Sequence, residues 1–214
     1  MASTYILGGG GLGREARLYL DDARLAGADL PGFGGFLEDY GPNDGRPPVA
    51  AGARLLERIR PEPGDRFLVA VGDPLLRARL AARLKALELA VATLIHPRAW
   101  VAPDALLGEG CLVAPFAFVG PGARLGDHVA LNTHASVGHD GSVGDHTVLS
   151  PYAVLNGNAA VGDSSFLGTG AAVVPHRRVG RRAQVAAGAV VTRDVPDFAL
   201  ASGNPAVARV LYAP

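Results

Sequence analysis

Residues 137–155 read VGHDGSVGDHTVLSPYAVL, and Val or Leu recurs at every sixth position of this stretch. The same register runs through sixteen positions without an insertion or deletion, and we call these positions anchors. The anchors are Val101, Leu107, Val113, Val119, Leu125, Leu131, Val137, Val143, Leu149, Leu155, Val161, Leu167, Val173, Val179, Val185 and Val191. A helix repeats every 3.6 residues or so and a strand every two, so a period of about six predicts short strands and turns stacked as a solenoid.

The residues between the anchors support this interpretation. The residue four places after an anchor is nearly always small, as at Ala105 and Cys111, and small residues suit tight corners. Gly or Asn directly follows many anchors, as at Gly108, Gly120 and Asn132. These residue types tolerate positive φ, so we expect the sharp turns to have positive φ at those positions.

The first 95 residues lack the hexad register and alternate short apolar strands with helical segments. We expect strands at 5–7, 33–37, 67–71 and 91–95, helices at 14–25 and 74–87, and a loop at 41–48. This alternation is typical of a small βαβ domain. The residue before a proline is restricted to extended geometry, so His96-Pro97 marks the start of a second domain. We therefore divide the chain into an α/β domain, 1–95, and a β-helical domain, 96–214.

Composition narrows the class of function. The chain has 214 residues, 49% of them hydrophobic, and 20 basic residues balance 20 acidic ones, which argues against a nucleic-acid partner. The only cysteine, Cys111, excludes an internal disulfide and, at a small-residue position, favours a buried structural thiol over a nucleophile. No apolar run has the length of a signal peptide core or a membrane span, so we expect a soluble, cytoplasmic protein without membrane insertion.

A glycine-rich motif lies in the N-terminal domain. Gly8, Gly10 and Gly13 satisfy G-x-G-x-x-G between an expected strand and helix, where bare backbone approaches a phosphate. Glu38-Asp39 ends the next expected strand, where dinucleotide enzymes place an acidic residue. Because the domain is about half of a dinucleotide fold, the sequence favours nucleotide binding over redox chemistry. Glycines needed only for tight strand-to-helix packing are the alternative.

Several motifs together point to a family. ILGGGGLGRE at 6–15, GFLED at 35–39 and VGD at 71–73 precede the hexads, which contain VGHD at 137–140, and GNPA follows at 203–206. This order resembles the sialic-acid and nucleotide-sugar O- or N-acetyltransferases, including bacillosamine- and perosamine-type N-acetyltransferases, among the hexapeptide-repeat acyltransferases. The resemblance implies a half-Rossmann-like domain followed by a left-handed parallel β-helix with about 18 residues per coil, hence about five coils.

The resemblance also implies cofactors, partners and site residues. It implies a homotrimer with active sites between subunits, a nucleotide-linked amino sugar on the N-terminal domain, acetyl-CoA on the β-helix, and no metal. It assigns His139 as the general base and Asp140 as the residue that holds the imidazole. Positions 18 apart stack, which puts the Gly157 N–H over His139 to meet a developing oxyanion. The contact with Asp140 requires a turn, because neighbouring strand residues face opposite ways.

The remaining assigned residues form two sets. The acetyl-CoA set is Gly157, Thr169, Ala187, Pro205 and Arg209, and the nucleotide-sugar set is Gly8, Gly10, Gly11, Gly13, Glu38, Asp39 and Gly72. Arg77 either pairs with a phosphate or is an exposed helix residue. Four arginines, Arg177, Arg178, Arg181 and Arg182, either meet the CoA phosphates or form a solvated surface. Family members often carry a second histidine nine residues after the base, near the acetyl group, and that position is Val148 here.

These inferences predict an acetyl-CoA-dependent N-acetyltransferase acting on a nucleotide-linked amino sugar. O-acetylation of a sialic-acid-like sugar is the near alternative, and a non-catalytic trimeric scaffold that senses a nucleotide is another. A metalloenzyme like the γ-class carbonic anhydrases would use His134 and His139, five residues apart. Its third ligand is expected about two coils earlier, where the chain has Arg98 and Pro103.

Overall fold

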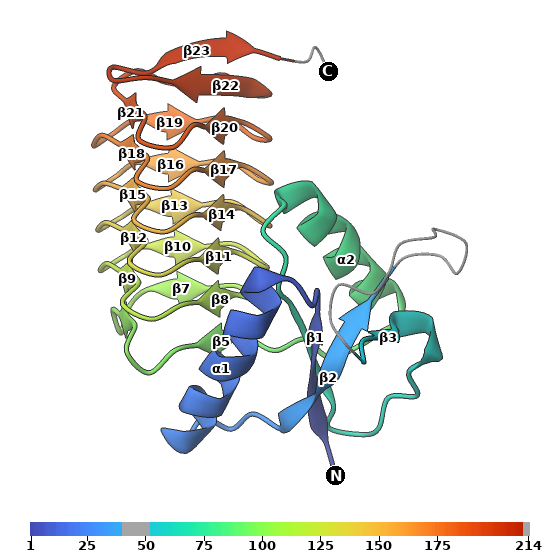
Figure 1. The fold of residues 1–214 in the computed structure, drawn as a ribbon. Helices are drawn as coiled ribbons and strands as arrows, with labels where there is room; N and C mark the ends of the chain where they lie inside the picture. Colours follow the sequence, from blue (N-terminus) through green and yellow to red (C-terminus); the bar gives the residue numbers. More distant parts are fainter. Residues whose placement is uncertain (40–51, 212–214) are drawn as a thin grey trace.

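The structure is a computed structural model and describes residues 1–39 and 52–211. An α/β region stands beside a tall, three-sided β-helix (Figure 1). The loop expected at 41–48 lies outside the described residues. Within the described ranges, no helix has the length and apolar character needed to span a membrane.

The N-terminal region is a parallel sheet in the order β3-β2-β1-β4, with one helix on each face. Its elements are β1 Ser3–Leu7, α1 Gly11–Leu25, β2 Gly32–Glu38, β3 Arg54–Leu55, the 3-10 helix η1 Leu56–Arg58, β4 Arg66–Val69 and α2 Pro74–Ala86. Alternate strand residues divide between two clusters, Ile6 and Leu68 facing α1, Leu7 and Val69 facing α2. Both expected helices and the first three expected strands are confirmed. The two-residue strand β3 is too short to produce a sequence pattern.

The strand expected at 91–95 does not form in this sheet. Val91 makes one isolated bridge with Phe67, and β5, Leu94–Ile95, then pairs with the β-helix. The Leu94 N–H donates to the Cys111 carbonyl at 2.8 Å, so its backbone partner comes from the coil above. Strand β5 therefore belongs to the β-helix sheet, and the domain division at residue 95 stays a prediction.

The hexads form one two-residue strand each, as their period predicted, and strands 18 residues apart pair in parallel on three faces, as the family resemblance implied. The docked face comprises β5, β8 Leu112–Val113, β11 Ala130–Leu131, β14 Val148–Leu149, β17 Phe166–Leu167, β20 Gln184–Val185, β22 Ala199–Ser202 and the antiparallel β23 Val207–Val210. The aromatic face comprises β6 Trp100–Val101, β9 Phe118–Val119, β12 Ser136–Val137, β15 Val154–Leu155, β18 Ala172–Val173 and β21 Val190–Val191. The arginine face comprises β7 Leu106–Leu107, β10 Arg124–Leu125, β13 Ser142–Val143, β16 Ala160–Val161 and β19 Arg178–Val179. Strands β5, β22 and β23 lengthen the docked face beyond the hexads.

The anchors and the small corner residues fill the interior of the β-helix, where nearly all are buried. Helix α1 covers the docked face, with Ala16 and Leu20 in one apolar cluster with Leu112, Ala130 and Val148. Burial of the leucine and valine side chains among them contributes about 2 kcal/mol each. The N-terminal elements are thereby fixed to one face, and the other two faces are left uncovered (Figure 1).

Positive φ occurs at a different corner position from the one expected. The Gly and Asn residues directly after the anchors have no positive φ, whereas every residue three after an anchor from 110 to 188 has it. Most of these are not glycine, as with His128, His134 and Asp140. The expectation was wrong because the turn needs its left-handed residue two places later.

The glycines after arginine-face anchors have a steric role instead. A Cβ on Gly108, Gly126 or Gly144 would overlap the carboxylate of an aspartate 19 residues later. Those carboxylates accept backbone N–H bonds from the coil below, as when Asp145 Oδ1 accepts from Asp127 N at 2.8 Å. We call this corner, between the arginine and docked faces, the aspartate edge.

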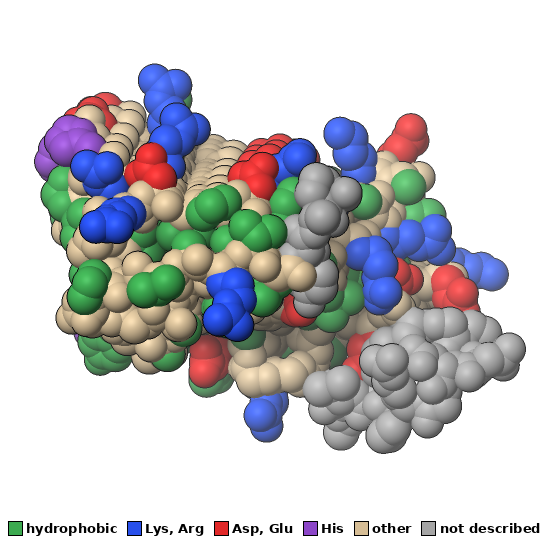
Figure 2. Space-filling model, turned by 90° about the horizontal axis from the view of Figure 1, so that it is seen from above, with side chains coloured by type: hydrophobic (Ala, Val, Ile, Leu, Met, Phe, Trp, Pro, Cys, Tyr) green, Lys and Arg blue, Asp and Glu red, His purple; other side chains and the backbone are tan. Residues whose placement is uncertain are grey.

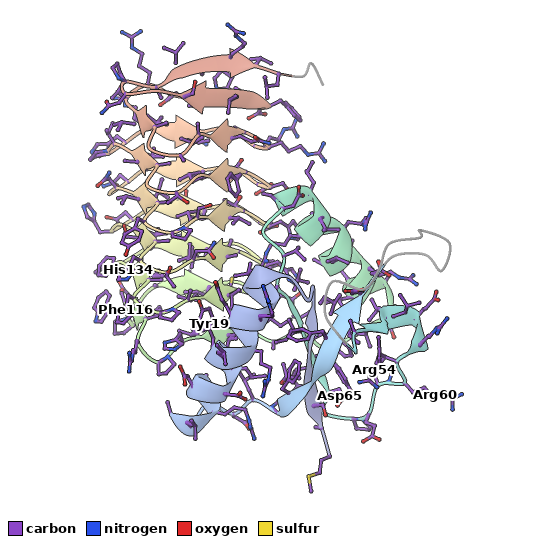
Figure 3. All side chains as sticks on the ribbon, viewed as in Figure 1. Tyr19, Arg54, Arg60, Asp65, Phe116 and His134 are labelled. Carbon is purple, nitrogen blue, oxygen red and sulfur yellow. The ribbon has the colours of Figure 1, made fainter. Side chains whose placement is uncertain are left out.

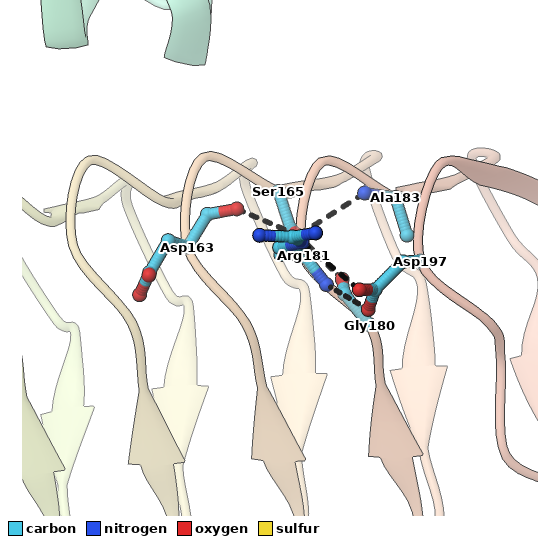
Figure 4. Close-up of polar contacts among 6 residues, drawn as sticks. All are labelled: Asp163, Ser165, Gly180, Arg181, Ala183 and Asp197. Carbon is cyan, nitrogen blue, oxygen red and sulfur yellow. Dashed lines mark hydrogen bonds and ion pairs between the residues drawn. The ribbon is translucent and has the colours of Figure 1, made fainter. Parts of the chain in front are cut away.

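Buried hydroxyls also join neighbouring coils at the aspartate edge. The Ser165 Oγ donates to the Gly180 carbonyl at 2.7 Å and accepts from the Ala183 N–H at 3.2 Å (Figure 4). At the same edge, Arg181 Nε lies 3.0 Å from Asp197 Oδ2. The polar groups of this edge are thus largely used within the β-helix.

Candidate active site

His139 lies in the turn between β12 and β13, at the corner between the aromatic and arginine faces, which we call the histidine edge. Its Nδ1 is 2.9 Å from Asp140 Oδ2, and the positive φ of Asp140, 57°, supplies the required turn. A carboxylate only accepts hydrogen bonds, so Nδ1 carries the proton and Nε2 is the basic nitrogen. The two side chains are 64% and 60% exposed, so this pair is open to a substrate.

Gly157 lies beside this ring, as the stacking of residues 18 apart predicted. A Cβ on Gly157 would meet the imidazole, 2.6 Å from Cε1 and 2.9 Å from Cδ2. Among the described residues, no acceptor takes a hydrogen bond from the Gly157 N–H. The equivalent N–H groups of the aspartate edge are capped by carboxylates. The histidine edge therefore presents a basic nitrogen and an unoccupied N–H side by side.

Three of the other histidines stack on rings, whereas His176 is exposed on the histidine edge, between β18 and β19. His128 and His146 stack at 5.5 Å on the aspartate edge, where burial lowers the pKa of His128 to about 4. His134 lies between the rings of Phe116 and Tyr152, and Figure 3 shows Phe116 and His134 on the outer side of the β-helix. Viewed down the β-helix, histidine side chains project at its outer border (Figure 2).

His96 joins the two parts of the chain. Its Nε2 is 3.0 Å from Asp22 Oδ2 in α1, and its Nδ1 accepts from the Arg98 N–H at 3.0 Å. His96 is 3% exposed, so its ring nitrogens are both used and hidden. Of the histidines with a carboxylate partner, His139 is the exposed one.

A cavity of about 460 Å³ in the N-terminal region gathers most of the nucleotide-sugar set. Gly8, Gly10, Gly11, Glu38, Asp39 and Gly72 all line it. It lies at the carboxyl ends of β1, β2 and β4, beside the first turn of α1. The N-cap of α1, Gly10, makes no side-chain capping bond, so the first N–H groups of this helix remain open to an anion.

Two predicted residues of this region have other roles. Gly13 does not line the cavity; a Cβ there would overlap the Gly8 carbonyl oxygen, so it serves close packing of α1 on β1. Arg77 is fully buried, which contradicts both expected roles. Its Nε donates to the His128 carbonyl and its Nη1 to the Val71 carbonyl at 2.9 Å, joining α2 to the β-helix. Burial lowers the pKa of this guanidinium to about 10.

The acetyl-CoA set is not brought together within one chain. Gly157 adjoins His139, whereas Thr169 and Ala187 stack at the corner between the docked and aromatic faces, where Gly188 N donates to Thr169 O at 2.9 Å. Pro205 lies in the turn between β22 and β23, and Arg209 lies on β23. Their roles stay predictions.

Three further expectations concern side chains around this set. Val148 is buried against α1, on the face opposite the histidine edge, so it is not next to His139 of its own chain. The arginine cluster divides: Arg177 Nη1 lies 3.8 Å from Asp194, and Arg181 pairs with Asp197. It is therefore not a continuous patch of unpaired cations. Burial raises the pKa of the Cys111 thiol to about 11, which fits a structural thiol.

The metal alternative required His134 and His139 to share one ion. The structure places them on different corners, at opposite borders of the aromatic face. Among the described residues, no three His, Cys, Asp or Glu side chains converge as metal ligands. The spacing of five residues is a consequence of the hexads and does not bring the two imidazoles together.

Sequence reasoning missed some cavity residues. Arg79 lines the cavity from α2, and Arg83 Nε lies 3.8 Å from Asp39 Oδ1 at its border. Helix α2 carries four basic residues, Arg77, Arg79, Arg83 and Lys85. Which of these side chains face the cavity depends on how α2 is rotated about its axis against the sheet. The apolar pattern of the helix sequence does not determine that rotation.

Comparison with solved structures identifies close matches along the whole chain. PerB from Caulobacter crescentus, solved with CoA and GDP-perosamine, is 32% identical, with a TM-score of 0.81 over 98% of both chains. The acetyltransferase domain of PglB from Neisseria gonorrhoeae is 29% identical, with a TM-score of 0.82 over 97% of this chain and 99% of that one. It has also been solved with acetyl coenzyme A. WeeI from Acinetobacter baumannii, 24% identical with a TM-score of 0.80 over 98% of this chain and all of that one, shares the fold.

No family model matches the sequence, and no curated protein matches it. The likeness to PerB nevertheless extends over both regions and exceeds a likeness of fold alone, and it confirms the family and the left-handed β-helix expected from the motifs. This chain belongs to the nucleotide-sugar acetyltransferases of the left-handed β-helix class, the family of the perosamine and bacillosamine-type enzymes, and is an acyltransferase.

Proposed function

We propose that the protein is a cytoplasmic, homotrimeric N-acetyltransferase that moves the acetyl group of acetyl-CoA to an amino group of a nucleotide-linked sugar. The observation that carries the proposal is the His139–Asp140 pair, 2.9 Å apart, beside the unoccupied N–H of Gly157. The relatives support the substrates: PerB was solved with CoA and GDP-perosamine, and the PglB domain with acetyl coenzyme A.

In this mechanism His139 Nε2 is the general base. It takes a proton from the sugar amine as the amine nitrogen attacks the thioester carbonyl carbon. The new C–N bond turns the carbonyl oxygen into an oxyanion, which accepts a hydrogen bond from the Gly157 N–H. The C–S bond then breaks, and the CoA thiolate leaves and recovers a proton from the imidazolium. Asp140 keeps the proton on Nδ1 and stabilises the charged ring.

The nucleotide would occupy the N-terminal cavity. The open first turn of α1 and the bare backbone of Gly8 to Gly11 would hold the diphosphate, because helix N-termini attract anions. Glu38 and Asp39, at the carboxyl end of β2, would meet the ribose or the base. This assignment follows from the position of these groups around one cavity.

The positions of the nucleotide cavity and of His139 favour an active site formed between two chains. The cavity belongs to the elements that cover the docked face, whereas His139 lies on the corner opposite that face. The width of the β-helix therefore separates the cavity from His139 of the same chain. A second copy has to supply the cavity that serves each His139.

The uncovered aromatic face has the exposed apolar side chains expected of an interface with a second copy of the chain. Trp100 and Phe118 stack at 4.8 Å and are 51% and 39% exposed, and Phe116 and Tyr152 on the adjoining corner are also exposed. Large exposed apolar groups of this kind mark interaction surfaces. This face borders the histidine edge, so a copy packed on it would reach His139.

The decisive experiment measures CoA thiol release with a panel of UDP-, GDP-, dTDP- and CMP-linked amino sugars. We expect release with one of them, lost in His139→Ala. Turnover that survives in His139→Ala would refute the mechanism. Silence across the panel with nucleotide binding intact would favour the scaffold hypothesis.

Mixed trimers test the arrangement between chains. Gly11 lines the cavity, and a Cβ there meets nothing within 4 Å, so Gly11→Phe should block the cavity without disturbing the fold. Chains with His139→Ala and chains with Gly11→Phe should each be inactive alone. Co-expressed, they should regain part of the activity, because one chain then supplies the cavity and its neighbour the base. No recovery in verified mixed trimers would place cavity and base in the same chain.

A further inference from the structure

The nucleotide cavity contains an imbalance of charge. The proposed ligand brings the negative charges of a diphosphate into it, and a cation at its border, Arg83, already lies 3.8 Å from the cavity carboxylate Asp39. The open N-terminus of α1 provides only about half of an elementary charge. A cation is needed to offset the remaining negative charge, since like charges in a partly enclosed site repel each other strongly.

The N-terminus of α2 does not provide that charge. Its N-cap, Asp73, accepts a hydrogen bond from the Leu76 N–H at 2.8 Å, so its own carboxylate occupies this helix end. Arg77 does not provide it either, because it does not line the cavity and two of its nitrogens already donate to the His128 and Val71 carbonyls. Among the described residues, the remaining candidates for this cation lie elsewhere on α2 or on α1.

Arg79 is the basic side chain that lines the cavity among the described residues. It lies two residues after Arg77, about 200° further round the helix, so the two side chains point in opposite directions. Leu76 and Leu80, three before and one after, line the same cavity and confirm which side of α2 faces it.

The guanidinium of Arg79 is also unused. It makes no hydrogen bond or ion pair with any residue that the structure describes. The basic residue one turn later, Arg83, is by contrast 3.8 Å from Asp39. Arg83 therefore holds a cavity carboxylate, while none of the described residues occupies a donor of Arg79.

We propose that Arg79 is a substrate-binding residue that grips the diphosphate of the nucleotide sugar, across the cavity from the first turn of α1. This inference rests on the proposed function, because it takes a nucleoside diphosphate as the group in the cavity. A planar guanidinium donates two parallel hydrogen bonds to phosphate oxygens, which a single ammonium cannot do. Arg79 thus fixes the position of the phosphates as well as their charge.

The test compares ligands with and without phosphates. Binding of GDP, UDP, guanosine and uridine is measured by calorimetry on the wild type, Arg79→Gln and Arg79→Lys, with Lys85→Gln as the matched control. Lys85 is exposed on the same helix and outside this cavity, so its replacement removes the same charge. We expect Arg79→Gln to weaken binding of the diphosphate about tenfold and leave the nucleoside unchanged. The diphosphate affinity of Arg79→Lys should lie between those of the wild type and Arg79→Gln, and that of Lys85→Gln should match the wild type.

Each contrary result has a separate meaning. Equal diphosphate binding by Arg79→Gln and wild type would overturn the role of Arg79, as would an equal loss for diphosphate and nucleoside. Thermal unfolding of each variant shows whether the fold is retained. If the wild type binds none of GDP, UDP, dTDP and CMP, measured in the same way, the nucleotide cavity itself is refuted, and with it the proposed function.

Discussion

Replacing Gly157 with alanine tests the active site with a single methyl group. The new Cβ would lie 2.6 Å from Cε1 and 2.9 Å from Cδ2 of His139, and closer still to Nε2. Atoms of this kind rest about 3.5–4.0 Å apart, so the ring must move by roughly 1 Å or more. The side chain is 64% exposed and can swing outward, so the fold itself should lose little stability.

The expected loss is therefore in catalysis. A displacement of about 1 Å in a catalytic group costs on the order of 10²-fold in rate, which is about 2.7 kcal/mol of transition-state stabilisation. We expect kcat for CoA thiol release to fall by that factor while the melting temperature and nucleotide affinity stay near those of the wild type.

A double variant separates the two roles of this residue. If Gly157→Ala acts by moving the imidazole, it should not lower further the residual rate of His139→Ala, measured at high enzyme concentration. An unchanged kcat in Gly157→Ala would refute the placement of the base beside Gly157. An equal loss in the His139→Ala background would show that the methyl group acts on the oxyanion or on acetyl-CoA instead.

Three further predictions address neighbouring features. Asp140→Asn should lower kcat about 10- to 100-fold in steady-state kinetics with unchanged folding, because the exposed His139 loses the carboxylate that fixes its tautomer. Burial and the nearby Arg77 lower the pKa of His128 from 6.5 to about 4, so the unfolded chain binds more protons between these values and the protein loses stability as the pH falls through them. Urea unfolding should show about 2 kcal/mol of this loss between pH 7 and pH 5, and a smaller slope in His128→Asn, since Asn tolerates the positive φ. Gly13→Ala should lower the free energy of unfolding by about 3 kcal/mol, because the new methyl group meets a backbone carbonyl that cannot move away. The melting temperature should fall strongly as a result, and a wild-type melting temperature would contradict the packing described.

The β-helix could be predicted because each of its short strands corresponds to one six-residue repeat in the sequence. Each anchor reports one strand, and the count of 18 residues per coil correctly brought Gly157 to His139. The His139–Asp140 contact was predictable too, because it is local and needs only a turn.

Contacts between distant elements were not predictable in this way. Arg77 has the sequence environment of an exposed helix residue, and only the packing of α2 against the β-helix shows that it is buried. Strand β5 satisfies the pattern of a fourth strand in the N-terminal sheet, but its hydrogen-bond partners belong to the next coil. The assignment of positive φ failed because Gly and Asn permit that conformation without requiring it.

The aspartate edge implies a coupled pattern of substitution. A glycine at one coil leaves the room that the aspartate carboxylate of the next coil fills, at an offset of 19 residues, as with Gly126 and Asp145. Losing the aspartate should release the glycine from its steric constraint, and gaining a side chain at the glycine should expel the aspartate. Pairs of Gly and Asp that change together at this offset would therefore distinguish corners sealed by their own side chains from corners left open for a ligand.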